Sequence, residues 1–203
     1  MARVLRPYRR GVAVAQVERS GSAQRVLDVA LALFTEHGFD GTSLQQIADR
    51  LGVTKAAVYY HFRSKDDLLA ALVDPAFAEL EDLLSRTEAL PRGAARQKCA
   101  LSEFVDYLLR HREAAAWMSR DAAALTRPAV WERAQGTQRR LEALAAPGED
   151  DPLSRLWGGA ITQALAGAVL AQPHADEDWL RTEVAELSAH LLSGYRAARR
   201  RQG

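Results

Sequence analysis

The chain has 203 residues, of which 48% are hydrophobic, so it is long enough for one large or two small domains with a packed core. Mean hydropathy is −0.23, and no apolar run approaches the ~20 residues that a membrane-spanning helix needs. The net charge of +1 does not by itself indicate nucleic-acid binding, but residues 1–72 carry ten basic and seven acidic side chains, whereas the remainder carries 17 and 19.

Residues 1–20 are basic, with Arg3, Arg6, Arg9 and Arg10 ahead of a short apolar stretch. This stretch lacks the long apolar core of a signal peptide. We therefore expect residues 1–20 to form a flexible arm. Cys99 is the single cysteine, so no internal disulfide can form, which fits a reducing cytoplasm. We expect a cytoplasmic protein.

The first expected helix covers residues 22–37, where apolar residues recur at helical spacing, and Gly38 is its stop signal. A second helix over 43–51 opens at Ser43, with Gln46 three residues later as a capping box. Gly52 ends this second helix. Thr54 caps a third, short helix that runs to residue 61.

Ser64, with Asp67 three residues later, caps a fourth helix, and Pro75 is expected to break or kink it. The rest of the chain keeps helical periodicity and contains no convincing β-strand, with helices expected over 76–89, 94–111, 113–125, 128–145, 152–171 and 176–199. The fold class is therefore all-α. We place a domain boundary near Asp74 and Pro75, with residues 21–74 before it, 75–199 after it, and a tail at 200–203.

The second and third helices have the spacing of a helix-turn-helix. Their packed seam is expected to contain Leu44, Ile47, Ala48, Leu51, Val53 and Val58. The outward face of the third helix then presents Lys55, Ala56, Ala57, Tyr59 and Tyr60. Alanines allow close approach to a groove and can touch a thymine methyl, while lysine can reach guanine acceptors or phosphate. Alternatively, the tyrosines cover the edge of a small domain and His61 caps a helix.

Residues 25–73 resemble the N-terminal domain of TetR-family transcriptional regulators. The motifs that carry the resemblance are ALALF at 30–34, HGF at 37–39, TSLQQIA at 42–48, LGVT at 51–54 and YYHFRSKDDLL at 59–69. The resemblance implies a three-helix helix-turn-helix domain, followed by a larger helical domain that binds a ligand and dimerises. It buries Phe62 and implies a DNA-facing set of Ser43, Gln45, Thr54, Lys55, Ala56, Ala57, Tyr59, Tyr60, His61 and Lys65.

For the larger domain the resemblance implies a cavity between helices. The candidate lining residues are Phe104, Tyr107, Trp117, Met118, Trp131 and Trp157. For any one of these side chains, ordinary core packing is an equally good interpretation.

The last two expected helices carry a stripe of small residues and a stripe of leucine and valine. Small residues let helices approach closely. Packing within one subunit would explain both stripes. The resemblance instead implies a two-fold four-helix bundle made from these helices of two subunits. The expected interface consists of Leu156, Ala160, Gln163, Gly167, Leu180, Val184, Leu187 and Leu191.

The histidines show no metal-ligand spacing, and no nucleophile elbow, phosphate loop or pair of catalytic carboxylates is visible. We therefore expect no enzyme, metal or cofactor. The expected function is a homodimeric transcriptional repressor that a small apolar or aromatic molecule releases from a palindromic DNA operator. The alternative is a constitutive DNA-organising or partner-binding protein with a filled core and no effector.

Overall fold

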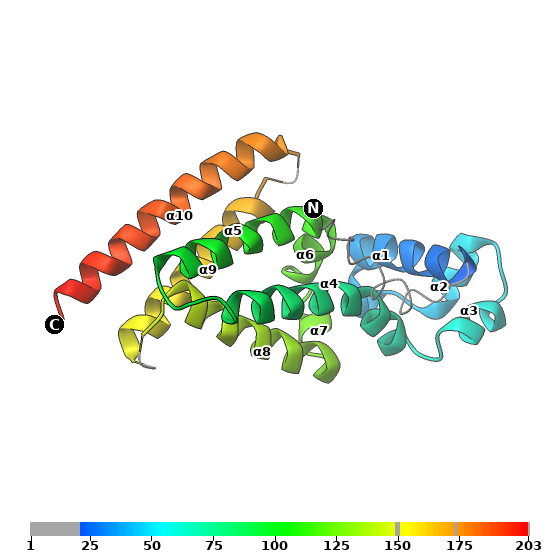
Figure 1. The fold of residues 1–203 in the computed structure, drawn as a ribbon. Coiled ribbons are helices and arrows are strands. Elements are labelled where there is room, and N and C mark those ends of the chain that lie inside the picture. Colours follow the sequence, from blue (N-terminus) through cyan, green and yellow to red (C-terminus); the bar gives the residue numbers. More distant parts are fainter. Residues whose placement is uncertain (1–20, 149–150, 173, 203) are drawn as a thin grey trace, which may run out of the picture. The chain divides into compact units, whose positions relative to one another are not determined.

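The computed structural model describes residues 21–148, 151–172 and 174–202. The expected arm therefore lies outside the described residues. Within them all regular structure is helical, as the sequence predicts, and no helix is long and apolar enough to cross a membrane. Figure 1 shows the helices in chain order: α1 (Gly21–Gly41), α2 (Leu44–Leu51), α3 (Lys55–His61), α4 (Lys65–Glu88), α5 (Ala94–Arg110), α6 (Arg112–Met118), α7 (Ala122–Leu125), α8 (Pro128–Ala145), α9 (Pro152–Leu170) and α10 (Glu177–Arg200).

The chain divides by its contacts into two compact units, and the division falls between Leu68 and Leu69, inside α4. The first unit contains α1, α2, α3 and the first residues of α4. The second contains the rest of α4 and the helices that follow it. The sequence placed the boundary a few residues later, near Asp74 and Pro75.

In the first unit, α1 is interrupted at Gly38, whose φ of 75° lies in the region that glycine adopts most easily. This conformation turns the chain so that Phe39 is fully buried, with its ring 5.2 Å from that of Phe34. The buried Thr42 hydroxyl then donates to the carbonyl oxygens of Leu33, at 3.1 Å, and Gly38, at 2.9 Å. The stop signal predicted at Gly38 is thus present, as a kink within one longer helix.

Two predicted helix boundaries in the second unit are wrong. Pro75 does not break α4, which continues to Glu88 and replaces the two helices expected on either side of it. The guanidinium of Arg133, from α8, binds Asp74 at 2.6 Å and Glu81 at 2.9 Å, and it lies 5.0 Å from the centre of the Phe77 ring. These contacts brace α4 on both sides of the proline. The helix expected over 113–125 is split at residues 119–121 into α6 and α7.

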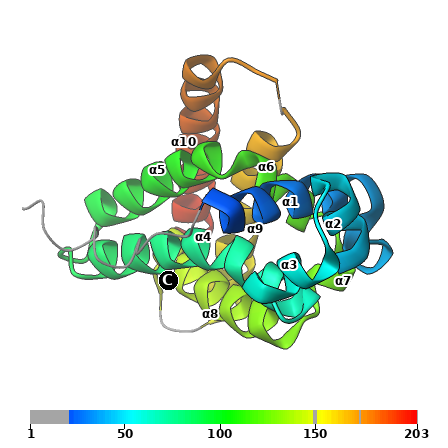
Figure 2. The ribbon, with the colours of Figure 1, turned by 90° about the vertical axis from the view of Figure 1, so that its right-hand side faces the viewer.

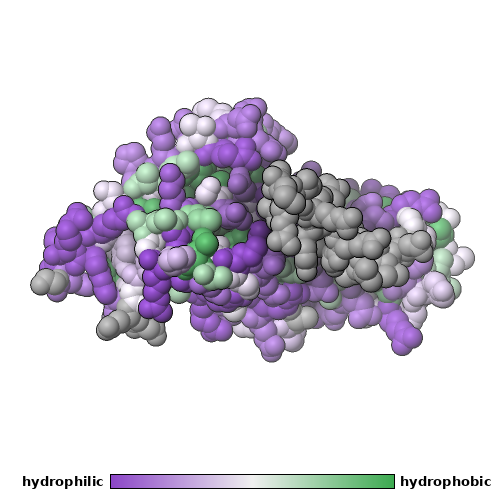
Figure 3. All heavy atoms as spheres, viewed as in Figure 1, coloured by the Kyte–Doolittle hydropathy of each residue, from purple (hydrophilic) through white to green (hydrophobic). Residues whose placement is uncertain are grey.

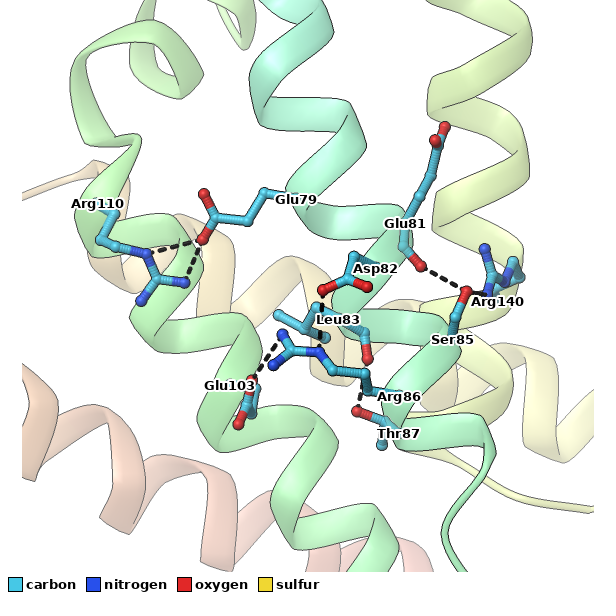
Figure 4. Close-up of polar contacts among 10 residues, drawn as sticks. All are labelled: Glu79, Glu81, Asp82, Leu83, Ser85, Arg86, Thr87, Glu103, Arg110 and Arg140. Carbon is cyan, nitrogen blue, oxygen red and sulfur yellow. Dashed lines mark hydrogen bonds and ion pairs between the residues drawn. The ribbon is translucent and has the colours of Figure 1, made fainter. Parts of the chain in front are cut away.

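Further ion pairs and hydrogen bonds join α4 to its neighbours within the second unit (Figure 4). Glu79 accepts from Arg110 of α5 at 2.5 and 2.9 Å. Arg86 lies 3.6 Å from Glu103 of α5, and Arg140 of α8 donates to Ser85 at 3.0 Å. The polar contacts thus involve Glu79, Ser85 and Arg86 of α4. The buried leucines of α4, Leu80, Leu83 and Leu84, belong to the core.

The core of the second unit is built around α9, which packs against α5, α8 and α10. Figures 1 and 2 show these helices side by side. Gly158 allows the close contact between α9 and α8, because a Cβ there would lie 2.7 Å from the backbone oxygen of Glu142. Gly194 of α10 likewise lies against the ring of Trp157 of α9, where a Cβ would come within 2.8 Å.

The far end of α10 is tied to the start of α9 by polar contacts. The Tyr195 hydroxyl donates to the carbonyl oxygen of Pro147 at 2.7 Å, and Arg199 binds Asp151 at 2.7 Å. Asp151 is also the N-cap of α9. The backbone N–H of Ser154, with its hydroxyl and Arg199, lowers the pKa of Asp151 to about 2.

Gly158 and its neighbour Gly159 give a matched test of this packing. Gly158→Ala should destabilise the protein by about 1–3 kcal/mol, because the new methyl group collides with the backbone of α8. Gly159→Ala should be neutral or stabilising by up to about 1 kcal/mol, since its Cβ would be 3.6 Å from Glu142 and alanine favours a helix. Urea unfolding measures both. Equal effects of the two changes would contradict the close contact at Gly158.

Candidate nucleic-acid interface

The turn between α2 and α3 is fixed by caps that the sequence predicts. The Ser43 hydroxyl accepts from the Gln46 N–H at 3.3 Å, and the Gln46 side chain accepts from the Ser43 N–H at 2.7 Å. At the other end of α2, Gly52 is left-handed, with φ 67°, and its N–H donates to Asp49. Thr54 then accepts from the Ala57 N–H and opens α3. These local contacts set the direction in which α3 leaves the turn.

The helix α3 has one buried side chain, Val58, which is fully shielded from solvent. Ile47 and Ala48 of α2 are also fully buried, as the predicted seam requires. Val53 is not part of that seam. It is 43% exposed, because it lies in the turn outside both helices, where helical spacing does not determine its direction.

Because Val58 points inward, the opposite side of α3 points to solvent. Tyr59 is 52% exposed and Tyr60 is 86% exposed, and both line a shallow open depression together with Lys55 and Ala56. Two adjacent exposed tyrosines next to a lysine make a surface that can donate hydrogen bonds to phosphate oxygens.

His61 and Phe62 complete the ring cluster of residues 59–62 and point away from that exposed surface. Phe62 is buried, as the resemblance implied. His61 is only partly exposed, and its Nε2 lies 3.2 Å from the Ser22 hydroxyl at the start of α1. Its ring also lies edge-on to Tyr60, with 5.2 Å between the ring centres. His61 therefore links the end of α3 to the start of α1.

Lys65 links the start of α4 to the other end of α1. Its ammonium donates to the carbonyl oxygens of Phe39, at 2.5 Å, and Asp40, at 3.4 Å, and lies 4.4 Å from the centre of the Phe39 ring. A positive charge at these carbonyls interacts favourably with the negative end of the α1 dipole. Sequence patterns alone do not reveal this contact, because the partners are 25 and 26 residues away.

The remaining candidates on this surface are exposed. Gln45 donates to the Asp49 carboxylate at 2.7 Å, one turn along α2. Ser43, Thr54 and Ala57 are also exposed, and the hydroxyls of the first two serve as helix caps.

The described first unit is not a basic domain. Residues 21–68 contain five basic and six acidic side chains. The basic ones are Arg25, Arg50, Lys55, Arg63 and Lys65, and the acidic ones are Asp28, Glu36, Asp40, Asp49, Asp66 and Asp67. The positive excess of the first 72 residues therefore comes from the arm at 1–20, whose structure is not described. Any attraction of the first unit to DNA depends on where its charges lie rather than on their sum.

In the second unit, the candidate ligand residues are found in different environments. Phe104, Tyr107 and Trp117 are buried, whereas Trp131 is 49% exposed. Met118 and Trp157 are half-buried. The Tyr107 ring lies 6.3 Å from that of Phe104 and 4.8 Å from that of His111, and burial raises the pKa of Tyr107 to about 12.

Around Tyr107 the polar groups form an ion cluster. His111 contacts the Glu79 carboxylate at 2.7 Å, on the oxygen that Arg110 leaves open. Burial alone would raise the pKa of Glu79, but the hydrogen bonds from His111 and Arg110 lower it. In the described residues no group of three or more histidines, cysteines and carboxylates could hold a metal ion.

The expected interface residues separate into two groups. Leu156, Ala160, Gln163 and Gly167 are exposed on one side of α9, with Leu156 at 67%. On α10, in contrast, Leu180 and Val184 are buried in the core of their own unit, and Leu187 and Leu191 pack against it. In Figure 3 hydrophobic residues come to the surface on the left of the face shown, which belongs to the second unit.

Comparison with known proteins agrees with the helix-turn-helix geometry. Residues 26–72 match the family described as "Bacterial regulatory proteins, tetR family". This part of the chain, which contains the helix-turn-helix, is therefore similar to regulators of the TetR family. It is 39% identical over 66 residues to the HTH-type transcriptional regulator AcrR of Shigella flexneri, covering 32% of this chain and 31% of AcrR. It is 29% identical over 122 residues to the HTH-type transcriptional regulator BetI of Escherichia coli, covering 58% of this chain and 63% of BetI.

The aligned part thus spans less than two thirds of these relatives. Solved structures extend the likeness in fold. Mycobacterium smegmatis AmtR has a TM-score of 0.68 at 21% identity, covering 87% of this chain and 88% of AmtR. The regulator FadR of Bacillus subtilis, solved in complex with stearoyl-CoA, has a TM-score of 0.59 at 18% identity, covering 84% of this chain and 98% of FadR.

Tyr60 and Lys65 should respond differently to substitution, although both were expected to contact DNA. Tyr60→Phe removes an exposed hydroxyl, so it should weaken binding to all duplex DNA about equally and leave the melting temperature unchanged. Lys65→Ala should lower both DNA affinity and stability, since it removes the contact to α1, and such charge-assisted bonds contribute about 1 kcal/mol when partly exposed. Thermal unfolding and DNA titration together test this. A Lys65→Ala protein with unchanged stability would contradict the structural role.

Proposed function

We propose that this protein is a homodimeric transcriptional regulator of the TetR family that binds a palindromic DNA operator and acts as a repressor. One observation carries the proposal: α3 buries Val58 and exposes Lys55, Ala56, Tyr59 and Tyr60 together. A short helix held this way by a helix-turn-helix fits the major groove. The relatives AcrR and BetI are named as transcriptional regulators, which supports the same function.

The exposed side of α9 is the proposed dimer surface. Leu156, Ala160, Gln163 and Gly167 recur every three to four residues, so they form one stripe on the side of α9 opposite its buried residues. Three of the four are small or apolar, and a stripe of this kind is suited to close contact with a second copy. Leu180 and Val184 support this surface from inside the subunit rather than belonging to it.

The proposed effector is a small apolar or aromatic molecule bound in the second unit near Phe104, Tyr107 and Trp117. The buried rings of Phe104 and Tyr107, next to the contact between His111 and Glu79, offer apolar contact and a polar anchor for such a ligand, and Trp117 is also buried. FadR, which shares this fold, was solved in complex with stearoyl-CoA, a ligand with a long apolar acyl chain. The helix α4 supplies a covalent route between the two units, because it begins in one and ends in the other.

Gly167 gives a clean test of dimerisation. No atom lies within 4 Å of the position of a Cβ at Gly167, so a side chain there leaves the subunit's own fold intact. Gly167→Glu should bury a charge in the interface, produce monomers, and abolish operator binding, because two half-sites must be bound together. Sedimentation velocity and DNA titration measure the two effects, and Ser102→Glu, an exposed change on α5, is the control. A Gly167→Glu dimer with full operator affinity would refute this interface.

Ligand control is tested with small apolar and aromatic molecules selected by thermal shift. A ligand that releases the protein should lower operator affinity about 5- to 150-fold, the usual range for coupling between two sites. Trp117→Phe should change the ligand response more than the ligand-free operator affinity, whereas Trp179→Phe, at an exposed position on α10, should change neither. A ligand that binds tightly but leaves operator affinity unchanged would favour the constitutive alternative.

A further inference from the structure

Basic side chains of the second unit are concentrated in two segments, one at the start of α5 and one at the end of α10. Residues 89–98 and 196–202 together contain seven basic side chains and no acidic one. The other residues from 73 to 203 contain ten basic and nineteen acidic side chains. The seven form what we call the basic end: Arg92, Arg96, Lys98, Arg196, Arg199, Arg200 and Arg201.

Contacts between α5 and α10 bring the two segments together. Gln97 is buried near the start of α5, where its amide donates to the carbonyl oxygen of Ala145 at 2.6 Å and accepts from Arg196 of α10 at 3.2 Å. Toward the other ends of the two helices, Arg181 of α10 binds Asp106 of α5 at 2.8 Å. The two helices therefore run in opposite directions, and the start of α5 lies beside the last turns of α10 (Figure 1).

Most charges of the basic end are exposed and have no carboxylate within ion-pair distance in the described part of the chain. Arg199 is the exception, because it binds Asp151 at 2.7 Å. Glu149 and Asp150, which precede Asp151 in the sequence, lie outside the described residues. The exposed cations without an ion pair to a described carboxylate include Arg92, Lys98, Arg200 and Arg201.

Helix stability explains only the α10 half of the basic end. Cations near the C-terminus of a helix are favourable, so Arg199 and Arg200 can stabilise α10 on their own. At the start of α5 the helix dipole is positive, and its first turn contains no acidic residue. The three cations there, Arg92, Arg96 and Lys98, are therefore not explained by the stability of α5. They indicate an anionic partner from outside the subunit.

The composition of the basic end indicates which anion fits. Arginine supplies six of the seven charges, and its guanidinium binds phosphate through two parallel hydrogen bonds. Protein interfaces have an apolar centre enriched in aromatic residues, and helices that bind membranes present a broad apolar face. The two segments contain no aromatic residue, and Leu90 is their one leucine. A nucleic-acid backbone requires no apolar surface, because its phosphates bind cations directly.

We infer that the basic end binds the phosphate backbone of duplex DNA without sequence preference. Each copy of the chain then has two DNA-binding surfaces, the helix-turn-helix in the first unit and the basic end in the second. The inference goes beyond the proposed function and does not require α3 to bind DNA. A helix-turn-helix that holds an operator would nevertheless raise the local concentration of DNA near the basic end.

The experiment titrates a fluorescent DNA duplex of random sequence with the full-length protein at a series of salt concentrations. All proteins compared carry Ala56→Glu, which places a negative charge on the exposed surface of α3 and weakens binding by the helix-turn-helix. In this background, Arg92→Gln, Lys98→Gln and Arg200→Gln together should make the dependence of log affinity on log salt shallower by about 2.7. Each lost phosphate contact contributes about 0.9 to this slope.

A matched control changes the net charge by the same amount elsewhere in the second unit. Arg120→Gln, Ala122→Glu and Gln172→Glu together also lower the net charge by three, and all three positions are exposed. This control should leave the slope unchanged, because none of its residues belongs to the basic end. Thermal unfolding checks that both triple variants fold.

The outcomes separate the inference from the proposed function. Equal slopes for the basic-end variant and the matched control overturn the inference. Binding to vesicles of phosphatidylserine and phosphatidylcholine, without binding to the duplex, also overturns it, since the basic end would then be a membrane surface. The proposed function is tested separately, by selecting an operator from random duplexes with the wild-type protein. If no duplex is enriched but the slopes differ as expected, the operator proposal fails and the basic end still binds DNA.

Discussion

The burial of Val58 is the constraint on which the exposed surface of α3 depends. A helix of seven residues is too short to be stable alone, so its existence requires packing by the rest of the unit. With Val58 fixed against the seam of α2, helical periodicity leaves no choice for its neighbours. Ala56, Tyr59 and Tyr60 therefore face outward, and Lys55, three residues before Val58, is exposed as well. The four consecutive ring residues at 59–62 divide between solvent and interior.

Two residues next to the exposed tyrosines, His61 and Lys65, make contacts within the first unit. His61 contacts Ser22 at the start of α1, and Lys65 contacts Phe39 and Asp40 near its end. The helix α1 is thus held at both ends by residues next to the exposed surface. Two of the three N–H donors of Lys65, and the Nε2 of His61, already have internal partners, which leaves fewer donors for phosphate. This makes Tyr60, at 86% exposure, the better candidate for contact with the DNA backbone alone.

Sequence patterns were sufficient for the caps of α2 and α3, where the deciding contacts are local. The capping box at Ser43 and Gln46, the left-handed Gly52 and the cap at Thr54 involve residues within five positions of one another, and all are present. The patterns failed where distant contacts decide. Pro75 remains inside α4, where Arg133, 59 residues from Asp74, contacts the helix on both sides of the proline. A proline removes one helical hydrogen bond, so the helix around it depends on such distant contacts.

The two stripes on α9 and α10 show a second limit, which concerns direction rather than distance. A helix that packs on both sides presents two apolar stripes, and periodicity does not say which one faces the core. Gly158, against the Glu142 backbone, and Gly194, against Trp157, fix the rotation of α9 and α10 about their axes. Once α9 is fixed in this way, Leu156, Ala160, Gln163 and Gly167 are left exposed, while α10 turns Leu180 and Val184 inward. The close approach at two glycines therefore determines which half of the sequence-based interface remains available to a second copy.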